Sequence, residues 1–93
     1  MADYYQNRRL ARAINRAADI LVVSNYCVTF LQGEVFNLEA TREREIRKIR
    51  VVIDTITRDD ELKVKALKLP AVCIKEIWCK RFDDSVFLVK EIK

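Results

Sequence analysis

The chain has 93 residues, of which 51% are hydrophobic and 34% are charged, and its formal net charge at pH 7 is +4. This length predicts a single domain over residues 1–93, and the high apolar content excludes a disordered composition. The absence of histidine and the presence of only one glycine exclude histidine-dependent catalytic triads and glycine-rich phosphate-binding loops.

Residues 3–19 have the pattern of an amphipathic helix. Asp3 and Gln6 stand at the spacing of a capping box, which favours a helix that begins here. Apolar side chains recur every three or four residues and form one stripe, made of Leu10, Ala13, Ile14, Ala17 and Leu21. We therefore expect a helix that buries this stripe in the core.

Residues 20–36 support two interpretations. Their β-branched and aromatic side chains favour strands. Their apolar residues also keep the three- and four-residue spacing of a helix, so both states remain open. Gly33 is expected to mark a turn.

Residues 38–57 predict a second amphipathic helix. Isoleucines recur at helical spacing, at positions 46, 49, 53 and 56. Asn37 is placed to cap this helix, and Glu39 and Glu43 suit the positive end of its dipole. Because residues 51–57 prefer a strand, we expect the helix to end early.

Residues 59–69 are compatible with a strand or a helix. Apolar residues alternate with lysines over residues 62–66, which is the two-residue period of a half-exposed strand. A competing helix would be capped by Thr57, with Asp60 three residues later completing a capping box. Pro70 ends either element.

The last third of the chain predicts a β-hairpin. Residues 71–80 and 85–93 are rich in strand formers and flank a turn that contains Asp83 and Asp84. Together these elements indicate an α+β fold, in which two main amphipathic helices pack on a small antiparallel sheet with a C-terminal β-hairpin. A mostly α-helical bundle is the alternative.

The first expected helix carries most of the excess positive charge. Four arginines lie on the side opposite the apolar stripe, three of them at four-residue steps: Arg8, Arg9, Arg12 and Arg16. No acidic residue occurs between Asp3 and Asp19, and only Arg16 has an acid, Asp19, within helical reach. Because a guanidinium presents a planar fork that suits phosphate oxygens, these arginines predict contacts with a nucleic-acid backbone.

The segment 42–50, REREIRKIR, is also strongly basic, but on a helix it would pair its own charges. Three acid–base pairs stand at helical spacing, namely Glu43 with Arg47, Glu39 with Arg42, and Glu45 with Lys48. We expect this segment to assist nucleic-acid binding through Arg44, Arg47, Lys48 and Arg50.

The cysteines predict no metal site. Cys27, Cys73 and Cys79 lack the spacing and the histidine partners of a zinc site. We interpret them as small buried hydrophobic residues, with an intermolecular disulfide as the alternative.

The hydropathy pattern predicts no membrane partner. The longest uncharged run, residues 20–33, is too short and too polar to span a bilayer. Because the N-terminus also lacks the apolar region of a signal peptide, we expect an intracellular protein, either cytoplasmic or associated with a nucleoid or nucleus.

These observations favour a small basic nucleic-acid-binding protein that is not an enzyme and needs no cofactor. Its arginine-rich N-terminal helix would contact phosphates, most simply those of DNA. The high apolar content of so short a chain also favours a homo-oligomer, in keeping with a homodimer.

Two other functions remain open. The chain could be a protein–protein interaction or assembly module that oligomerises through its amphipathic helices. It could also be a metal-dependent nuclease, because Asp54, Glu61 and Lys63 imitate an acid…acid-x-lysine pattern in which the carboxylates hold Mg²⁺.

Overall fold

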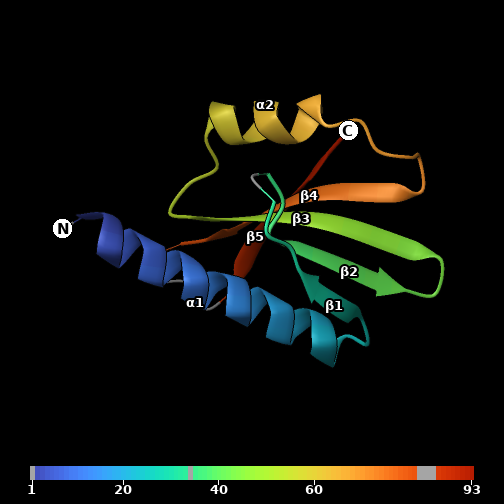
Figure 1. Ribbon diagram of the computed structural model, residues 1–93, viewed down its shortest axis with the longest axis horizontal. Coiled ribbons are helices and arrows are strands. Elements are labelled where there is room, and N and C mark those ends of the chain that lie inside the picture. Colours follow the sequence, from blue (N-terminus) through green and yellow to red (C-terminus); the bar gives the residue numbers. More distant parts are fainter. Residues whose placement is uncertain (1, 34, 82–85) are drawn as a thin grey trace.

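Helices lie on both faces of a mixed β-sheet in the computed structural model of the chain, which describes residues 2–33, 35–81 and 86–93 (Figure 1). In chain order its elements are α1 (Ala2–Val23), β1 (Cys27–Phe30), β2 (Leu38–Arg42), β3 (Glu45–Ile53), α2 (Arg58–Ala66), β4 (Cys73–Lys80) and β5 (Phe87–Ile92). The α+β class predicted from the sequence is therefore confirmed, and the helical bundle is wrong.

The strands lie side by side in the order β1-β2-β3-β4-β5. Neighbouring strands are antiparallel except β3 and β4, which are parallel, so the sheet is mixed and the prediction of an antiparallel sheet is confirmed only in part. A parallel pair needs a crossover between the end of one strand and the start of the next. Helix α2 makes this crossover, because it follows β3 and precedes β4.

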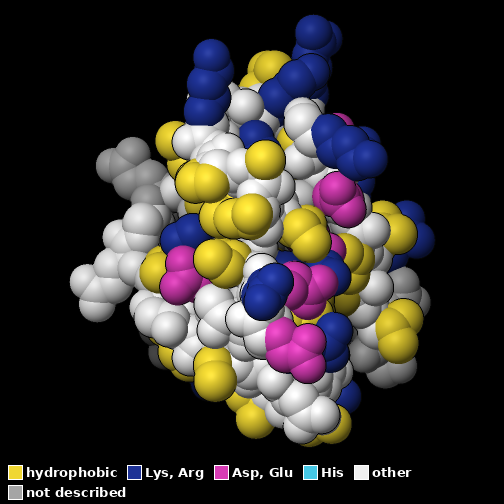
Figure 2. Space-filling view, turned by 90° about the vertical axis from the view of Figure 1, so that its right-hand side faces the viewer, with side chains coloured by type: hydrophobic (Ala, Val, Ile, Leu, Met, Phe, Trp, Pro, Cys, Tyr) yellow, Lys and Arg dark blue, Asp and Glu magenta, His cyan; other side chains and the backbone are white. Residues whose placement is uncertain are grey.

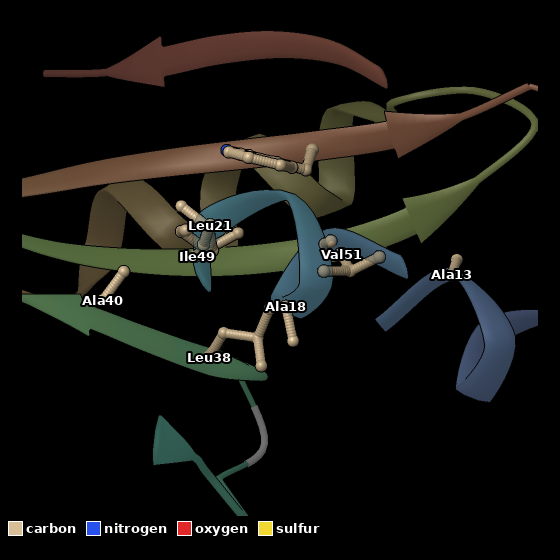
Figure 3. Packing of buried hydrophobic residues seen from close by; sticks show 9 residues of the cluster. Ala13, Ala18, Leu21, Leu38, Ala40, Ile49 and Val51 are labelled. Atoms are coloured by element: carbon tan, nitrogen blue, oxygen red, sulfur yellow. The ribbon is translucent and has the colours of Figure 1, made fainter. Parts of the chain in front are cut away.

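Helix α1 packs over β1, β2 and β3 on one face of the sheet. Figure 3 shows its alanines and Leu21 directed at strand residues such as Leu38 and Ile49. Both strand residues are fully buried. Burial of a side chain of this size contributes about 2 kcal/mol. The stripe of small residues lets the helix approach the sheet closely, which fixes α1 against β3.

Helix α2 covers the opposite face, where it packs over β4 and β5. The cluster beneath it contains Phe36, Val52, Val64, Ile77, Cys79 and Ile92. Since Val51 belongs to the α1 cluster and Val52 to the α2 cluster, β3 is buried on both faces. A strand covered on both faces has no exposed row, so its apolar residues run together without alternation.

The prediction of a helix over residues 38–57 is wrong. The segment forms β2, a turn and β3, with Leu38 opposite Ile49 in an antiparallel register. Isoleucines spaced by three and four residues fit one stripe of a helix, but on a strand buried on both faces they fall on either side. Asn37 caps no helix, and its Oδ1 instead accepts a hydrogen bond of 2.7 Å from the backbone N–H of Val51.

The helical interpretation of residues 59–69 is confirmed. Helix α2 begins with the predicted capping box, since the N–H of Asp60 donates to Thr57 Oγ1 over 3.1 Å and the N–H of Thr57 donates to Asp60 Oδ2 over 2.9 Å. At the other end, Lys75 Nζ donates to the carbonyl oxygens of Val64 and Leu67, over 3.1 and 3.0 Å. Both helix ends are therefore satisfied by side chains, as short helices require.

The remaining predictions were met in part. The first helix begins and ends beyond the predicted 3–19, and residues 20–36 divide into the end of α1 and the strand β1. The predicted C-terminal hairpin strands pair antiparallel as β4 and β5. Asp83 and Asp84, which were expected in the turn, lie outside the described residues.

Backbone turns are made without glycine. Within the described residues the left-handed positions are taken by Asn25, Glu43 and Asp54, with φ of 70°, 55° and 72°. Asn and Asp tolerate this region better than other residues because their short side chains bond locally. Asp54 therefore ends β3 abruptly and projects from the strand end.

Thr57→Ala is expected to lower the free energy of unfolding by about 1 kcal/mol, because it removes the cap of α2. Thr55→Ala is the matched control, since the same substitution lies two residues earlier and outside the capping box. Urea unfolding followed by circular dichroism measures both. Equal losses in the two variants would contradict the role of the cap.

Candidate nucleic-acid interface

A shallow hollow of about 310 Å³ lies between the N-terminal half of α1 and the ends of β3 and β4. Its walls carry Arg9, Arg12, Ala13, Arg16, Ile53, Lys80 and Arg81. We call this site the basic hollow and define its cations as Arg9, Arg12, Arg16, Lys80 and Arg81. Three of the four predicted arginines of the first helix thus meet two basic residues that sequence reasoning did not single out as ligands.

The fold brings these cations together for simple reasons. Arg9, Arg12 and Arg16 are spaced by three and four residues, so they share one face of α1. Ile53 and Lys80 are register partners at the ends of the parallel strands β3 and β4. Because α1 runs across this edge of the sheet, its arginines face the strand ends. No local sequence signal connects the two groups, since they lie about seventy residues apart along the chain.

Arg9 is held at the rim of the hollow by Asp54. Its Nη1 and Nη2 donate to Oδ2 and Oδ1 of Asp54, over 3.1 and 2.6 Å. This two-point contact lowers the pKa of Asp54 and raises the pKa of Arg9. Both groups are largely open to solvent, so the pair positions Arg9 more than it stabilises the fold.

Arg12 and Arg16 are exposed and have no ion pair or hydrogen bond to another side chain among the described residues. The expected contact between Arg16 and Asp19 is not formed. Like charges four residues apart on a helix repel each other by a few tenths of a kcal/mol. An anion bound between them would relieve this repulsion.

Arg8, the remaining arginine of the predicted row, does not line the basic hollow. It is exposed on α1, one residue before Arg9. At about a hundred degrees per residue, Arg8 lies about a hundred degrees from Arg9 around the helix, so it lies at the edge of the helix face that lines the hollow.

The cations of segment 42–50 form a different kind of arrangement, because the structure directs most of them inward. Lys48 Nζ lies 2.6 Å from Glu39 Oε1, across the β2–β3 pair. Arg50 Nε donates to Asp60 Oδ1 over 3.0 Å, and Arg50 Nη1 donates to the carbonyl oxygen of Val35. The helical pairs predicted for this segment are replaced by cross-strand pairs, which follow from the two-residue period of a strand.

Arg47 lies at the centre of a polar network on the α1 face. It donates to Glu45, to Tyr26 and to Glu76, whose other oxygen accepts a 3.0 Å bond from the indole N–H of Trp78. Glu76 is only 4% exposed, so its charge depends on Arg47. A buried carboxylate without a cation is costly, which makes Arg47 a structural residue.

Arg44 differs from its neighbours. It is exposed in the β2–β3 turn and no interaction of its side chain is formed within the described part of the chain. On the molecular face that contains this turn, basic side chains sit beside acidic ones in the centre, while others gather along the α2 edge (Figure 2). The residues predicted from segment 42–50 are therefore not brought together with those of α1.

The acid and lysine residues of the nuclease hypothesis have separate partners. Asp54 binds Arg9, Glu61 Oε1 lies 2.6 Å from Lys90 Nζ, and Lys63 pairs with Asp59. In the described ranges no group of three or more His, Cys, Asp or Glu side chains could hold a metal ion.

The cysteines occupy three different environments, all as free thiols. Cys79 is buried under α2, and burial raises the pKa of its thiol. Cys73 is half-buried at the start of β4, while Cys27 is exposed on β1. The prediction of three buried cysteines is thus correct for Cys79 alone.

One structural finding and three comparisons with known proteins concern no single site. None of the helices in the described residues has the length and apolar content that crossing a membrane requires. Protein-family models, curated protein sequences and solved structures were compared with the chain, and none matches. The proposed function therefore rests on the geometry of the site.

Arg47→Met is expected to lower the free energy of unfolding by about 2 kcal/mol, because it leaves Glu76 buried without a cation. Arg44→Met removes the same charge from an exposed turn and is expected to change stability by less than about 0.5 kcal/mol. Urea unfolding of both variants measures the difference. If the two were equally stable, Arg47 would not be structural.

The polar network also predicts a pH dependence. Hydrogen bonds from Arg47 and then from Tyr26 lower the pKa of Glu45 from 4.5 to about 2. A carboxyl with a depressed folded-state pKa contributes stability above its unfolded pKa, and this stability is lost as the pH falls through the folded value. Glu45→Gln should therefore be less stable than the unsubstituted chain at pH 7. The gap should narrow between about pH 4.5 and 2; a gap that stays constant over this range would contradict the assignment.

Proposed function

We propose that the chain is a small, non-enzymatic nucleic-acid-binding protein that holds backbone phosphates in the basic hollow. The observation that carries this proposal is that Arg12 and Arg16 are exposed beside Lys80 and Arg81 and have no acidic partner among the described residues. A protein that needed these arginines only for its fold would pair them, as it pairs Arg47 and Arg50.

The chemistry of the hollow suits phosphate. Guanidinium groups bind phosphate oxygens through two parallel N–H···O bonds, which are stronger than bonds between neutral groups. Seven residues separate Arg9 from Arg16, a span of about 10 Å along the helix axis. This span corresponds to about three nucleotide steps of a duplex strand. One copy of the protein therefore fits about three phosphates of one strand.

The charge balance of the hollow favours an anion of this kind. The basic hollow is lined by five cations and by no acidic side chain among the described residues, and Asp54 beside it engages Arg9. The contacts are made to phosphate and not to base edges, so we expect little sequence preference. Two acidic residues, Asp83 and Asp84, follow shortly after Arg81 in the sequence. Both lie outside the described residues.

The assembly-module alternative has less support in its original form. It required an amphipathic helix with an exposed apolar stripe, whereas Ala13, Ala17 and Leu21 of α1 are buried against the sheet. Exposed apolar side chains remain at the β5 edge of the sheet, where a strand of another chain could pair.

Arg12→Ala/Arg16→Ala is expected to weaken binding to both duplex and single-stranded DNA by about tenfold or more at low salt, because two of about three phosphate contacts are lost. The magnitude of the log–log salt slope should fall by about two. Fluorescence anisotropy of labelled DNA at several salt concentrations measures both quantities.

The control for this experiment is Lys65→Ala/Lys68→Ala, which removes the same net charge from exposed positions at and just beyond the end of α2. We expect only a small change in affinity from it. If the two double variants weakened binding equally, net charge and not the basic hollow would account for it. If the unsubstituted chain did not bind at low salt, the proposed function would fall.

Asp54→Asn is expected to change binding in the opposite direction. The substitution removes the carboxylate that occupies Arg9, so affinity for DNA should rise a few-fold at low salt. Asp59→Asn, which removes the same charge from the exposed side of α2 where it pairs with Lys63, is the matched control and should have a smaller effect. A loss of affinity in Asp54→Asn would mean that positioning of Arg9 outweighs its charge.

A further inference from the structure

The outer edge of β5 is unusually apolar for a strand that borders a sheet. In the strand order β5 is last, and within the described residues no further strand pairs with it. Leu88 and Val89 are 56% and 45% exposed on this strand, and Val86, one residue before it, is 68% exposed. Proteins normally protect such edges with lysine, proline, bulges or short strands, because open N–H and C=O groups pair readily with another chain.

Of the two charged residues of β5, Glu91 is exposed and Lys90 forms an ion pair. Lys90 is held on its own subunit by Glu61, whose Oε1 lies 2.6 Å from Lys90 Nζ. The opposite edge of the sheet, β1, has four residues against six in β5. Leu62 of α2, which is also exposed, borders the far end of β5 in a groove with Lys90 and Ile92. The exposed apolar surface of this region therefore centres on β5.

We propose that a second copy of the chain pairs antiparallel with β5, so that two sheets join into one about a twofold axis at Leu88. Opposed residues of an antiparallel pair point to the same face, and side chains alternate along a strand. A twofold axis perpendicular to the sheet keeps every side chain on the same face of the joined sheet. The residue at the axis must therefore stand opposite its own copy, because the copy of a neighbouring residue points to the other face. Four consecutive residues of β5 are exposed, Leu88 to Glu91, and an axis at Glu91 would set two glutamates opposite each other. The remaining candidates are Leu88, Val89 and Lys90.

The composition of β5 selects Leu88 among these three. An axis at Lys90 sets two lysines opposite each other, which is destabilising. An axis at Val89 sets Leu88 against Lys90 of the partner subunit, and Phe87 against Glu91 of the partner subunit. An axis at Leu88 pairs Leu88 with Leu88 of the partner subunit and Phe87 with Val89 of the partner subunit, and it sets Val86, just before the strand, against Lys90 of the partner subunit. Aromatic and β-branched side chains are favourable cross-strand partners.

This arrangement has a consequence for the proposed nucleic-acid interface, and the consequence rests on that function. A perpendicular twofold axis places both α1 helices, and hence both basic hollows, on the same side of the joined sheet. Each hollow lies near Lys80, which is the register partner of Phe87 and so one residue from the axis. Since each hollow is lined by both Ile53 of β3 and Lys80 of β4, the distance is counted from midway between these strands, and four strand spacings give a separation of about 20 Å.

A separation of this size exceeds the width of the major groove, about 12 Å. Each hollow would therefore contact a different strand of a duplex, and the two together would bridge a groove. A ladder of about five residue pairs lies at the small end of specific interfaces, below about 1,200 Å². We accordingly expect a concentration-dependent dimer that duplex DNA strengthens, because binding both hollows to one duplex raises their effective concentration.

The first arm of the test measures mass without DNA. Sedimentation equilibrium of the unsubstituted chain over the micromolar range should show a monomer–dimer equilibrium, and Leu88→Lys should remain monomeric over the same range. Leu88 is exposed on the α2 side of the strand, so the substitution leaves the hollow intact. Val72→Lys adds the same charge at a 64% exposed valine outside β5 and should dimerise normally. A monomeric unsubstituted chain, or a dimeric Leu88→Lys variant, would overturn the proposal.

The second arm separates the dimer from the proposed function. Leu88→Lys should keep its affinity for short single-stranded DNA but lose about tenfold or more on duplex DNA, with a salt slope of about half the magnitude. Arg12→Ala/Arg16→Ala should lose both affinities and still dimerise. Dimerisation without DNA binding would remove the proposed function alone, whereas arginine-dependent binding by a monomer would remove the β5 interface alone.

Discussion

Burial of the parallel pair β3 and β4 on both faces is the constraint on which the other features of this protein depend. The pair needs a crossover, which α2 supplies on one face, and it needs a second cover, which α1 supplies on the other. Because α1 must lie along β3 to bury Leu38, Ile49 and Val51, its N-terminal half comes to rest over the strand ends. The position of the basic hollow follows from this packing and not from any local motif.

The same constraint divides the positive charges into two groups. Cations on the central strand β3 cannot reach bulk water freely, so Arg47 and Arg50 are matched by Glu76 and Asp60. An unmatched charge in such a position would cost several kcal/mol. Cations on the solvent side of α1 face no such requirement, and Arg12 and Arg16 remain available for an external anion. A cluster of arginines along the sequence is therefore a poor indicator of ligand binding. An exposed arginine that has no acidic partner within the protein is a better one.

The sheet has two edges, and they differ in how they are completed. The edge at β1 is short, while the edge at β5 exposes a run of apolar side chains that water does not favour. A second copy at β5 would bury this run and would also set two phosphate-binding surfaces on one side of the sheet. In that arrangement, the exposed apolar edge and the two proposed phosphate-binding surfaces would belong to one assembly.

Local patterns in the sequence determined the features whose forces act over a few residues. The apolar stripe of α1, the Thr57 and Asp60 capping box and the antiparallel pairing of β4 with β5 each depend on near neighbours. The first and the last were predicted, and the capping box belonged to one of the two interpretations left open for its segment. Tertiary structure alone decided that residues 38–53 are strands, because a strand buried on both faces loses the alternation that identifies it and can imitate helical spacing. It also decided which arginines stay open to solvent, because their partners Glu76, Asp60 and Asp54 come from distant elements. The pairing of charges across a sheet is set by the register of the strands and not by separation along the chain.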